Sequence, residues 1–425
     1  MATYYVDSSS TGTDSGTLAN PYKTISKVNS LALNPGDQVL FKKGTTYSNV
    51  GFLYISRSGT SGSLITYSTY GTGSAPVFDK VGTGFTSVYF QRVNYVQVNG
   101  LQITDTTISP TNRSPLANVG AGVAMEGSTH CLLSSMSISL VGAGVTADLN
   151  TGISCDYNTF TNNYIYNLRM VYTGSGNNDD YGANGIILSG ASNNVISYNT
   201  FEGCYATSPD YGVDGGALEY YNSCSYNTAI YNTAINCNGF FENGADSPTN
   251  NCSNNVFAYN KIINCGGCAY IHATGSFNVN TSNLQFYNNV IVDTVTQLAN
   301  YSYMFWSDAA PATGSIVVKN NIFWVTTNNV VYKNSVFNSG SIIHSNNIYR
   351  MTTSSVGLPL LVTNQSLFDR SVNLFTSTLT TPAEWNYYPL AGAPSIQYGT
   401  NVGITKDFAG NTVSAKPTAG IFQYL

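Results

Sequence analysis

Charged residues are scarce in this chain. Asp, Glu, Lys and Arg together make up 9% of the 425 residues, against roughly a quarter in an ordinary soluble domain. Only 16 residues are Lys or Arg, and the net charge is −5. Binding to nucleic acid depends on a basic patch that neutralises phosphates. The composition therefore argues against a nucleic-acid partner.

Long apolar runs are also missing. No run reaches the roughly 18 residues that a membrane-spanning helix needs, so we expect no membrane partner. The chain begins Met1-Ala2-Thr3-Tyr4-Tyr5 and passes directly into a strand-like pattern. With the polar, weakly charged composition, this favours a secreted or extracellular protein whose signal has been removed, or one that leaves the cell by another route.

The eight Cys residues lack the paired CxxC spacing of a zinc site. Cys265 and Cys268 form a lone CxxC motif, which is weak support for metal binding. Free Cys commonly packs as a small apolar side chain. The sequence therefore predicts buried thiols, and it predicts no cofactor, with Ca²⁺ as the one exception discussed below.

In place of charge, the chain is rich in Gly, Asn, Ser, Thr and Tyr, and these residues form a repeat. The phrase VISYNTFE ends at Glu202 and returns in altered form, for example as VFAYNKII and LQFYNNVI. Its Asn falls at Asn199, Asn232, Asn260, Asn288, Asn320 and Asn346, in steps of 33, 28, 28, 32 and 26 residues. Steps of this size with alternating apolar residues indicate one β-coil per repeat. We expect each Asn to stack on the next and to hydrogen-bond along the ladder.

The repeat predicts a single domain over residues 1–425. Residues 1–50 form an N-terminal cap that includes a short amphipathic helix over about 24–33, ended by Pro35-Gly36. Residues 51–350 form the coils. Residues 351–425 are irregular strands and loops that cover the other end, because the terminal repeats of a solenoid must shield its apolar interior.

Three segments carry a resemblance to a known family. They are residues 20–47, the N-x-I-x-N coils, and the tail phrases YPLAGAPSIQYG at 388–399 and KDFAGN at 406–411. Together they resemble the pectate-lyase-like superfamily over nearly the whole chain. The resemblance implies an all-β fold, a single-stranded right-handed parallel β-helix, and a carbohydrate-active protein. Because that superfamily includes lyases, glycoside hydrolases, epimerases and phage tailspikes, it does not assign the reaction.

Each coil has a second strand, which can be aligned on its first residue: Gly185, Gly216, Gly239, Gly267 and Tyr303. Side chains alternate between the two faces of a strand. The second residue after each start is apolar and is predicted to point inward: Ile187, Leu218, Phe241, Ala269 and Phe305. The third and fifth are predicted to point outward: Leu188, Glu219, Glu242, Tyr270 and Trp306, then Gly190, Tyr221, Gly244, His272 and Asp308.

Glu219 and Glu242 would then stand one coil apart in the same outward column. Neighbouring strands are about 4.8 Å apart, so the carboxyls would be about 5 Å apart and could not both ionise easily. Retaining glycosidases use this spacing. We therefore predict a glycoside hydrolase with this catalytic pair. The larger inverting spacing of about 6.5–9.5 Å would instead pair Glu219 with Asp180 or Asp214.

Further residues are predicted to bind the substrate around this pair. His272 would position the sugar, Tyr270 and Trp306 would stack on it, and Arg169 would contact an acidic sugar. The remaining candidates on the same strands and turns are Tyr221, Asp179 and Asp246. A Ca²⁺ site that includes Asp214 and Asp246, or a plain solvated surface, is the alternative for the acidic residues. A structural His, a solvated Arg and incidentally exposed rings are the alternatives for the others.

Two other functions compete with hydrolysis. A polysaccharide lyase would need a base and a cation near a uronate carboxyl, for which Arg169, Lys261, Tyr270 and His272 are the candidates. Because basic residues are sparse, a highly anionic substrate is less favourable. The other alternative is a non-catalytic glycan-binding module, such as a tailspike shaft or an adhesin. In all three, the partner is a polysaccharide or oligosaccharide.

Overall fold

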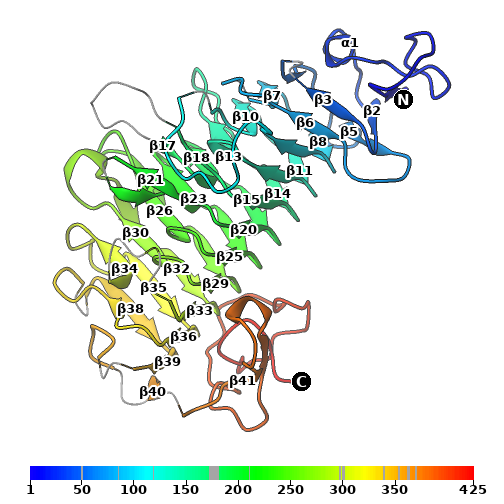
Figure 1. Cartoon of the computed structure of the whole chain (residues 1–425). Helices are drawn as coiled ribbons and strands as arrows, with labels where there is room; N and C mark the ends of the chain where they lie inside the picture. The colour runs from blue at the N-terminus through cyan, green and yellow to red at the C-terminus, as the bar shows by residue number, and fades with distance from the viewer. Residues whose placement is uncertain are drawn as a thin grey trace. The chain divides into compact units, whose positions relative to one another are not determined.

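The computed structural model describes the chain except for residues 49–50, 85, 118, 172–180, 210, 296–297, 299–301, 338–339, 353–354, 361–363 and 369–370. The chain divides into two compact units, Met1–Glu219 and Tyr220–Leu425, and each is described by itself. The single domain expected over 1–425 stays a prediction beside this division. In both units, successive strands pass through three parallel sheets in the same order (Figure 1). The fold is the predicted single-stranded right-handed parallel β-helix.

The first unit contains three parallel sheets. The first sheet has the order β1 (Thr3–Val6), β2 (Gln38–Lys42), β5 (Ile65–Tyr70), β8 (Val96–Asn99), β11 (Leu132–Ser134), β14 (Thr159–Thr161) and β19 (Val195–Ser197). The second has β4 (Leu53–Ile55), β7 (Val88–Gln91), β10 (Val123–Glu126), β13 (Ala143–Asp148) and β18 (Asn184–Ser189). The third has β3 (Thr46–Ser48), β6 (Val77–Asp79), β9 (Gln102–Thr104), β12 (Ser137–Ser139), β15 (Tyr164–Tyr166) and β20 (Thr200–Glu202). Strand β23 (Gly216–Tyr221) contains the unit boundary.

The second unit repeats this plan. Its first sheet has β24 (Thr228–Ile230), β28 (Val256–Ala258), β32 (Leu284–Tyr287), β35 (Ile316–Lys319) and β38 (Ile342–Ser345). Its second has β26 (Phe241–Gly244), β30 (Ala269–Ile271), β34 (Tyr303–Ser307) and β37 (Val330–Tyr332). Its third has β25 (Thr233–Ile235), β29 (Lys261–Ile263), β33 (Val290–Asp293), β36 (Ile322–Val325), β39 (Ile348–Met351) and β40 (Ser366–Phe368).

Short additional elements decorate the coils. Two antiparallel pairs lie in the first unit: β16 (Met170–Val171) with β17 (Tyr181–Gly182), and β21 (Ala206–Ser208) with β22 (Gly212–Asp214). The second unit adds the parallel pair β27 (Asn251–Ser253) and β31 (Asn280–Ser282), the antiparallel pair β41 (Phe375–Ser377) and β42 (Asn386–Pro389), and the 3-10 turns η1 (Gly275–Phe277) and η2 (Pro382–Glu384). In the described part of the chain, no helix is long and apolar enough to cross a membrane.

The interior of each coil is filled by like side chains in register. In the second unit, Phe257 and Phe286 occupy paired positions on β28 and β32 and stack at 4.8 Å between ring centroids. Phe305 meets Phe286 edge-on at 5.1 Å. All three rings are buried. Parallel strands of this kind place the same column of side chains inward on every coil, so one apolar ladder runs along the unit.

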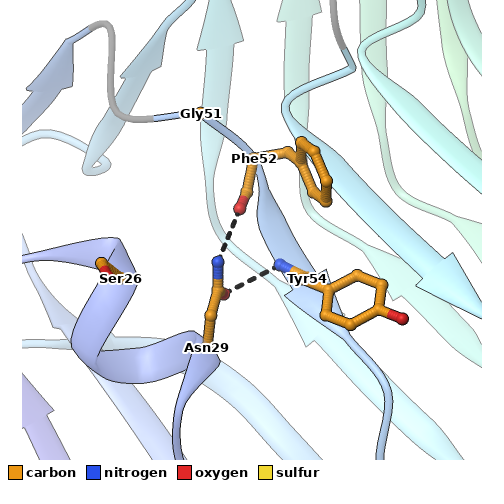
Figure 2. A pocket seen from close by; sticks show the side chains of 5 residues that line it. All are labelled: Ser26, Asn29, Gly51, Phe52 and Tyr54. Atoms are coloured by element: carbon orange, nitrogen blue, oxygen red, sulfur yellow. Dashed lines mark hydrogen bonds between the residues drawn. The ribbon is translucent and has the colours of Figure 1, made fainter.

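The predicted N-terminal helix is present but shorter than expected. Helix α1 (Ile25–Asn29) begins at the N-cap Thr24, whose hydroxyl accepts a hydrogen bond from the Lys27 amide, and it buries Ile25 and Val28. Figure 2 shows how it is fastened to β4: the Asn29 amide group donates to the Phe52 carbonyl and accepts from the Tyr54 amide, both at 2.9 Å. A cavity of about 400 Å³ lies at this junction and is lined by these residues with Ser26 and Gly51.

A ladder of buried Asn side chains runs between coils, as predicted, but with a register correction. In the second unit it consists of Asn232, Asn260, Asn289, Asn321 and Asn347, joined by side-chain bonds of 2.9–3.1 Å. In the first unit Asn199 accepts from Asn163 at 2.9 Å. The predicted positions Asn288, Asn320 and Asn346 precede the ladder by one residue. They adopt positive φ, which Asn tolerates better than most residues. Asn320 still donates to Asn288 one coil away at 3.0 Å, as predicted.

The tail from residue 371 onward lies against the outer face of the third sheet in the second unit. Its Leu374, Phe375, Tyr387, Ala419 and Ile421 pack on side chains from β29, β33, β36 and β39, including Ile263, Val290, Ile322, Trp324 and Ile348. Figure 1 shows this orange-to-red segment beside β33 and β36. The prediction placed residues 351–425 over the end of the coils, where the Val356 carbonyl does accept from the Tyr332 amide of β37 at 2.9 Å. It placed the part from residue 371 onward there as well. That part covers their side instead, because the outward residues of these strands are themselves apolar.

All eight Cys residues are free and buried, as predicted. Burial raises the pKa of Cys131, Cys155 and Cys252 to about 12. Cys265 and Cys268, the lone CxxC motif, are buried in the second unit. Thiols with pKa values this high carry almost no thiolate at neutral pH and are unreactive. They serve the interior packing.

Candidate functional site

The outward column on the second sheet of the second unit matches the predicted alternation. Phe241, Ala269 and Phe305 occupy paired positions on β26, β30 and β34 and are buried. The intervening column, also in register, holds Glu242, Tyr270 and Trp306. Because side chains alternate along a strand, His272 and Asp308 fall two residues further along the same outer face. The sequence therefore predicted which residues of β26, β30 and β34 occupy paired positions in each column.

The predicted alternation is wrong on β18 in the first unit. Leu188 was expected outside and is fully buried, whereas Ile187 was expected inside and is partly exposed. The prediction aligned Gly185 of β18 with Gly216 of β23, but the burial patterns of the two strands match when Asn184 is aligned with Gly216. An error of one residue assigns every side chain to the wrong face. The prediction is correct on β23, where Leu218 is buried and Glu219 is partly exposed.

His272 is held between two carboxylates in the second unit. Its Nε2 lies 2.9 Å from Glu242 Oε1, and its Nδ1 lies 3.4 Å from Asp308 Oδ2. Asp308 is fixed in turn by the Ala273 amide, which donates to Oδ1 at 2.7 Å. The His272 amide donates to the buried Asn243 side chain at 3.3 Å. The three side chains thus form a Glu–His–Asp network across β26, β30 and β34.

The charges of this network stabilise one another. Burial lowers the pKa of His272, but hydrogen bonds and charge interactions with Asp308 and Glu242 outweigh it and raise that pKa to about 10. Burial raises the pKa of Asp308, but the bond from His272 and two backbone amides bring it below its ordinary value. At neutral pH His272 is therefore an imidazolium that donates from both nitrogens. It is a poor base and a good anchor for a carboxylate.

Glu242 is the open end of the network. Its side chain is 30% exposed. Among the described residues, its Oε2 atom has no hydrogen-bond partner, because the single bond to this carboxylate comes from His272 to Oε1. A carboxylate that is oriented through one oxygen and free at the other is placed to act on a bound molecule.

Aromatic and basic side chains border His272. Trp306 is partly exposed, with its ring centroid 6.0 Å from that of the imidazole, and the Phe277 ring centroid lies 5.8 Å from it. The Lys333 amino group lies 4.6 Å from the centre of the Trp306 ring and donates to the Ser307 carbonyl. Lys333 therefore covers one face of the ring, and the predicted stacking of a sugar on Trp306 stays a prediction.

Tyr270 occupies the outward column but is buried, at 3% exposure. Its ring lies flat over glycines: a Cβ on Gly267 would come within 2.5 Å of the ring, and one on Gly239 within 3.0 Å. Its hydroxyl donates to the Asn238 carbonyl at 3.1 Å. The prediction that Tyr270 forms a sugar-stacking surface is therefore wrong, because the missing glycine side chains let the ring fold down onto the backbone.

Tyr221 and Asp246 lie together in the second unit. The Tyr221 hydroxyl donates to Asp246 Oδ1 at 2.6 Å, and Asn222 donates to Oδ2 at 3.3 Å. The gap above Gly244 is bordered by Tyr221 and by Phe277, which also contacts His272. Both predicted residues thus belong to the surroundings of the Glu–His–Asp network.

The remaining carboxylates of the prediction belong to the first unit. The Glu219 carboxylate accepts a hydrogen bond from Asn184. Asp214 ends β22 and accepts from the Gly215 amide at 2.6 Å. Asp179 and Asp180 lie outside the described residues. Because Glu219 and Glu242 belong to different units, their predicted spacing of about 5 Å stays a prediction, as does the pairing of Glu219 with Asp214 or Asp180.

Arg169 does not fit its predicted contact with an acidic sugar. The residue is completely buried, and its guanidinium donates to the carbonyls of Leu168 and Asn167 at 2.7 and 2.9 Å and to that of Ser109 at 2.8 Å. Burial and the neighbouring Arg113 lower its pKa to about 10. This Arg fastens the loop that contains Ser109 to the coils.

Sequence reasoning missed Lys333 and Phe277. Lys333 follows β37, one coil beyond the aligned strands, and Phe277 lies in the η1 turn, outside any repeat. Lys261, a candidate base for a lyase, lies on the third sheet with its amino group over the Phe408 ring of the tail. In the part of the chain that the structure describes, no group of three or more His, Cys, Asp or Glu is arranged to hold a metal ion.

Comparison with known proteins identifies the fold. No family model matches the sequence, and no curated protein matches it. The chain is similar to a GH136 lacto-N-biosidase from Eubacterium ramulus, with a TM-score of 0.54 and 16% identity over 87% of this chain and 67% of the other. It is also similar to XylC in complex with xylose, with a TM-score of 0.54 and 11% identity over 100% of this chain and 98% of the other. The likeness to pectate lyase Pel9A has a TM-score of 0.51 and 15% identity over 100% of this chain and 97% of the other. At these identities the likeness shows the fold alone, a right-handed parallel β-helix.

Proposed function

We propose that this protein is a carbohydrate-active enzyme, a glycoside hydrolase in which Glu242 is a catalytic carboxylate. The observation that carries the proposal is the open, oriented carboxylate of Glu242, held at 2.9 Å by His272 on the outer face of the coils. Structures with this fold include a lacto-N-biosidase and a pectate lyase. The fold is thus compatible with carbohydrate chemistry of either kind, and the residues decide between them.

The charge of His272 sets the role of Glu242. The imidazolium holds Oε1 of Glu242 at 2.9 Å, and Oε2 has no partner among the described residues. We assign Glu242 the role of nucleophile or general base, because its second oxygen is open to a bound molecule. Asp308 orients His272 and is a positioning residue. Hydrolysis requires a second, protonated carboxyl, for which Glu219 remains the candidate that the sequence predicts.

A polysaccharide lyase is the second candidate, and Lys333 is the observation in its favour. Burial lowers the pKa of this Lys below its ordinary value, and its amino group lies beside Trp306 at the edge of the network. A lyase needs a base next to a uronate carboxyl. His272 does not supply one, since it stays protonated to about pH 10. We rank the lyase second for this reason.

A panel of neutral and uronate-containing polysaccharides tests the proposal. We expect reducing ends to accumulate without the absorbance of an unsaturated uronate. Glu242→Gln should lower this rate by about a thousandfold, the scale of a lost general-base or nucleophile function, and should leave the melting temperature nearly unchanged. The matched control is Glu384→Gln, which changes an exposed Glu in η2 of the tail and should retain full activity.

Three other results would each replace the proposal. Growth of the uronate absorbance, lost in Lys333→Met, identifies a lyase. Binding without any cleavage identifies a glycan-binding module. Full activity of Glu242→Gln removes Glu242 from the reaction.

A further inference from the structure

A second outward surface, on the second sheet of the first unit, also joins aromatic rings and carboxylates. One column of paired residues consists of Tyr54, Tyr89, Ala124 and Thr146 on β4, β7, β10 and β13. The adjoining column consists of Gln91, Glu126 and Asp148. All seven side chains are partly exposed. They therefore share one face, and we call them the N-terminal face.

The aromatic side of this face is a ledge of three rings. Tyr54 and Tyr89 stack at 5.9 Å between centroids with 27° between their planes. Phe52 meets both edge-on, at 5.9 and 5.8 Å. Beyond Tyr89 the column drops to the short side chains of Ala124 and Thr146. The large Tyr89 ring is therefore followed, beside the carboxylates, by side chains that project less far from the sheet.

A hydrogen-bond network fixes the ledge to the polar column. The Tyr54 hydroxyl donates to Gln91, whose amide donates to the Tyr89 hydroxyl at 3.4 Å. Asn150 donates to Glu126 Oε2 at 2.7 Å. Burial and a hydrogen bond to Glu126 raise the pKa of Tyr89 to about 12. Rings and polar groups with fixed positions lose little freedom when a ligand binds.

The two carboxyls differ in their surroundings. Glu126 and Asp148 are directly paired on neighbouring strands. Glu126 accepts a hydrogen bond from Asn150 at 2.7 Å and is partly exposed. Burial, with the adjacent Glu126 charge, raises the pKa of Asp148 to about 6. The pair therefore offers both acceptor oxygens and, in mildly acidic solution, a donor hydroxyl.

We propose that the N-terminal face is a second carbohydrate-binding site, which takes an uncharged oligosaccharide with one sugar ring on the Tyr54–Tyr89 ledge and its hydroxyls on Glu126 and Asp148. A pyranose has an apolar C–H face and a rim of hydroxyls, which match a ledge beside carboxyl oxygens. A uronate is excluded because two adjacent carboxyls repel its charge. The exposed Leu149 and Ile153 flank the Asn150 turn and add apolar contact.

This site is independent of the proposed activity, so the test separates the two. The 425-residue chain with Glu242→Gln is fluorescently labelled and applied to an array of neutral and uronate oligosaccharides. The best neutral binder is then titrated calorimetrically into this protein and into versions that also carry Tyr89→Ala, Tyr89→Phe or Trp306→Ala. Melting curves verify that each variant is folded.

We expect Tyr89→Ala to weaken binding of the neutral oligosaccharide about tenfold, as loss of an aromatic anchor does. Tyr89→Phe keeps the ring and should weaken binding less. Trp306→Ala should leave this binding event unchanged. If no neutral oligosaccharide binds, if uronates bind equally well, or if folded Tyr89→Ala binds like its parent while Trp306→Ala does not, the N-terminal face is not a carbohydrate site.

Discussion

His272 has a folded-state pKa far above its value in an unfolded chain, which makes the network sensitive to alkaline pH. Its pKa rises from 6.5 to about 10 on folding. The stabilisation is therefore complete below about pH 6.5, declines as pH rises, and is lost above about pH 10. We expect the difference in unfolding free energy between the wild type and His272→Gln to follow this course in urea titrations from pH 6 to 10.5. A difference that stays constant over this range would contradict the charged network.

The outward position of a residue could be predicted from the sequence, but its exposure could not. Strand alternation placed Glu242 and His272 on the same face, and they do form a hydrogen bond. The same alternation placed Tyr270 there, yet its ring lies on Gly239 and Gly267 and is buried. Arg169 is buried by bonds to loop carbonyls. Contacts of this kind depend on segments between strands, about which the repeat carries no information.

At the scale of the element, the Asn ladder is the feature that joins one coil to the next. Asn260 accepts from the Asn232 amide at 2.8 Å and donates to the Ala229 carbonyl and to Asn289, both at 3.0 Å. It is completely buried. We expect Asn260→Ala to lower the free energy of unfolding by about 3 kcal/mol, because several buried groups lose their partners at once. Urea unfolding measures this loss.

The control for this prediction is Asn401→Ala, which changes an exposed Asn that accepts one local bond from Gly403. We expect a change of at most about 0.5 kcal/mol. Equal losses for the two variants would mean that the ladder contributes nothing beyond an ordinary Asn.

The ladder also shows how far a sequence repeat defines an element. Its existence and its position at Asn199, Asn232 and Asn260 followed from the sequence alone. In later coils the repeat contains Asn-Asn, and the second residue of each pair enters the ladder while the first takes positive φ. Both positions suit Asn for different reasons. The repeat does not distinguish the two positions, so the prediction named only the first Asn of each pair. Of these, Asn288 and Asn320 do bond to each other between coils.

At the scale of the whole molecule, periodicity predicts the coils because each one repeats the same local pattern. The tail has no period, and its packing depends on contacts between segments far apart in the chain, such as Trp324 with Phe375. The sequence does not show these contacts. It shows only that residues at outward positions of the third sheet are apolar. Apolar outward residues in successive coils thus indicate that a non-repeating segment covers that side.

The contribution of this cover can be measured at Phe375. The ring is 1% exposed, stacks on Trp324 at 5.4 Å and meets Tyr387 edge-on at 5.1 Å. We expect Phe375→Ala to lower the free energy of unfolding by about 3–5 kcal/mol, the usual result of deleting a buried ring. Two of the three Trp residues, Trp324 and Trp385, lie at this contact, so a shift of Trp emission to longer wavelength should accompany the loss.

Leu379→Ala is the matched control, because Leu379 follows β41 in the same tail and is 94% exposed. Its unfolding free energy should stay within about 0.5 kcal/mol of the wild type, with unchanged emission. The two variants remove apolar side chains only four positions apart, so general weakening of the tail would affect both alike. A large loss confined to Phe375→Ala would mean that the tail stabilises the second unit by burying the outer face of its third sheet. Similar small losses in both would mean that the coils of this unit are stable without that cover.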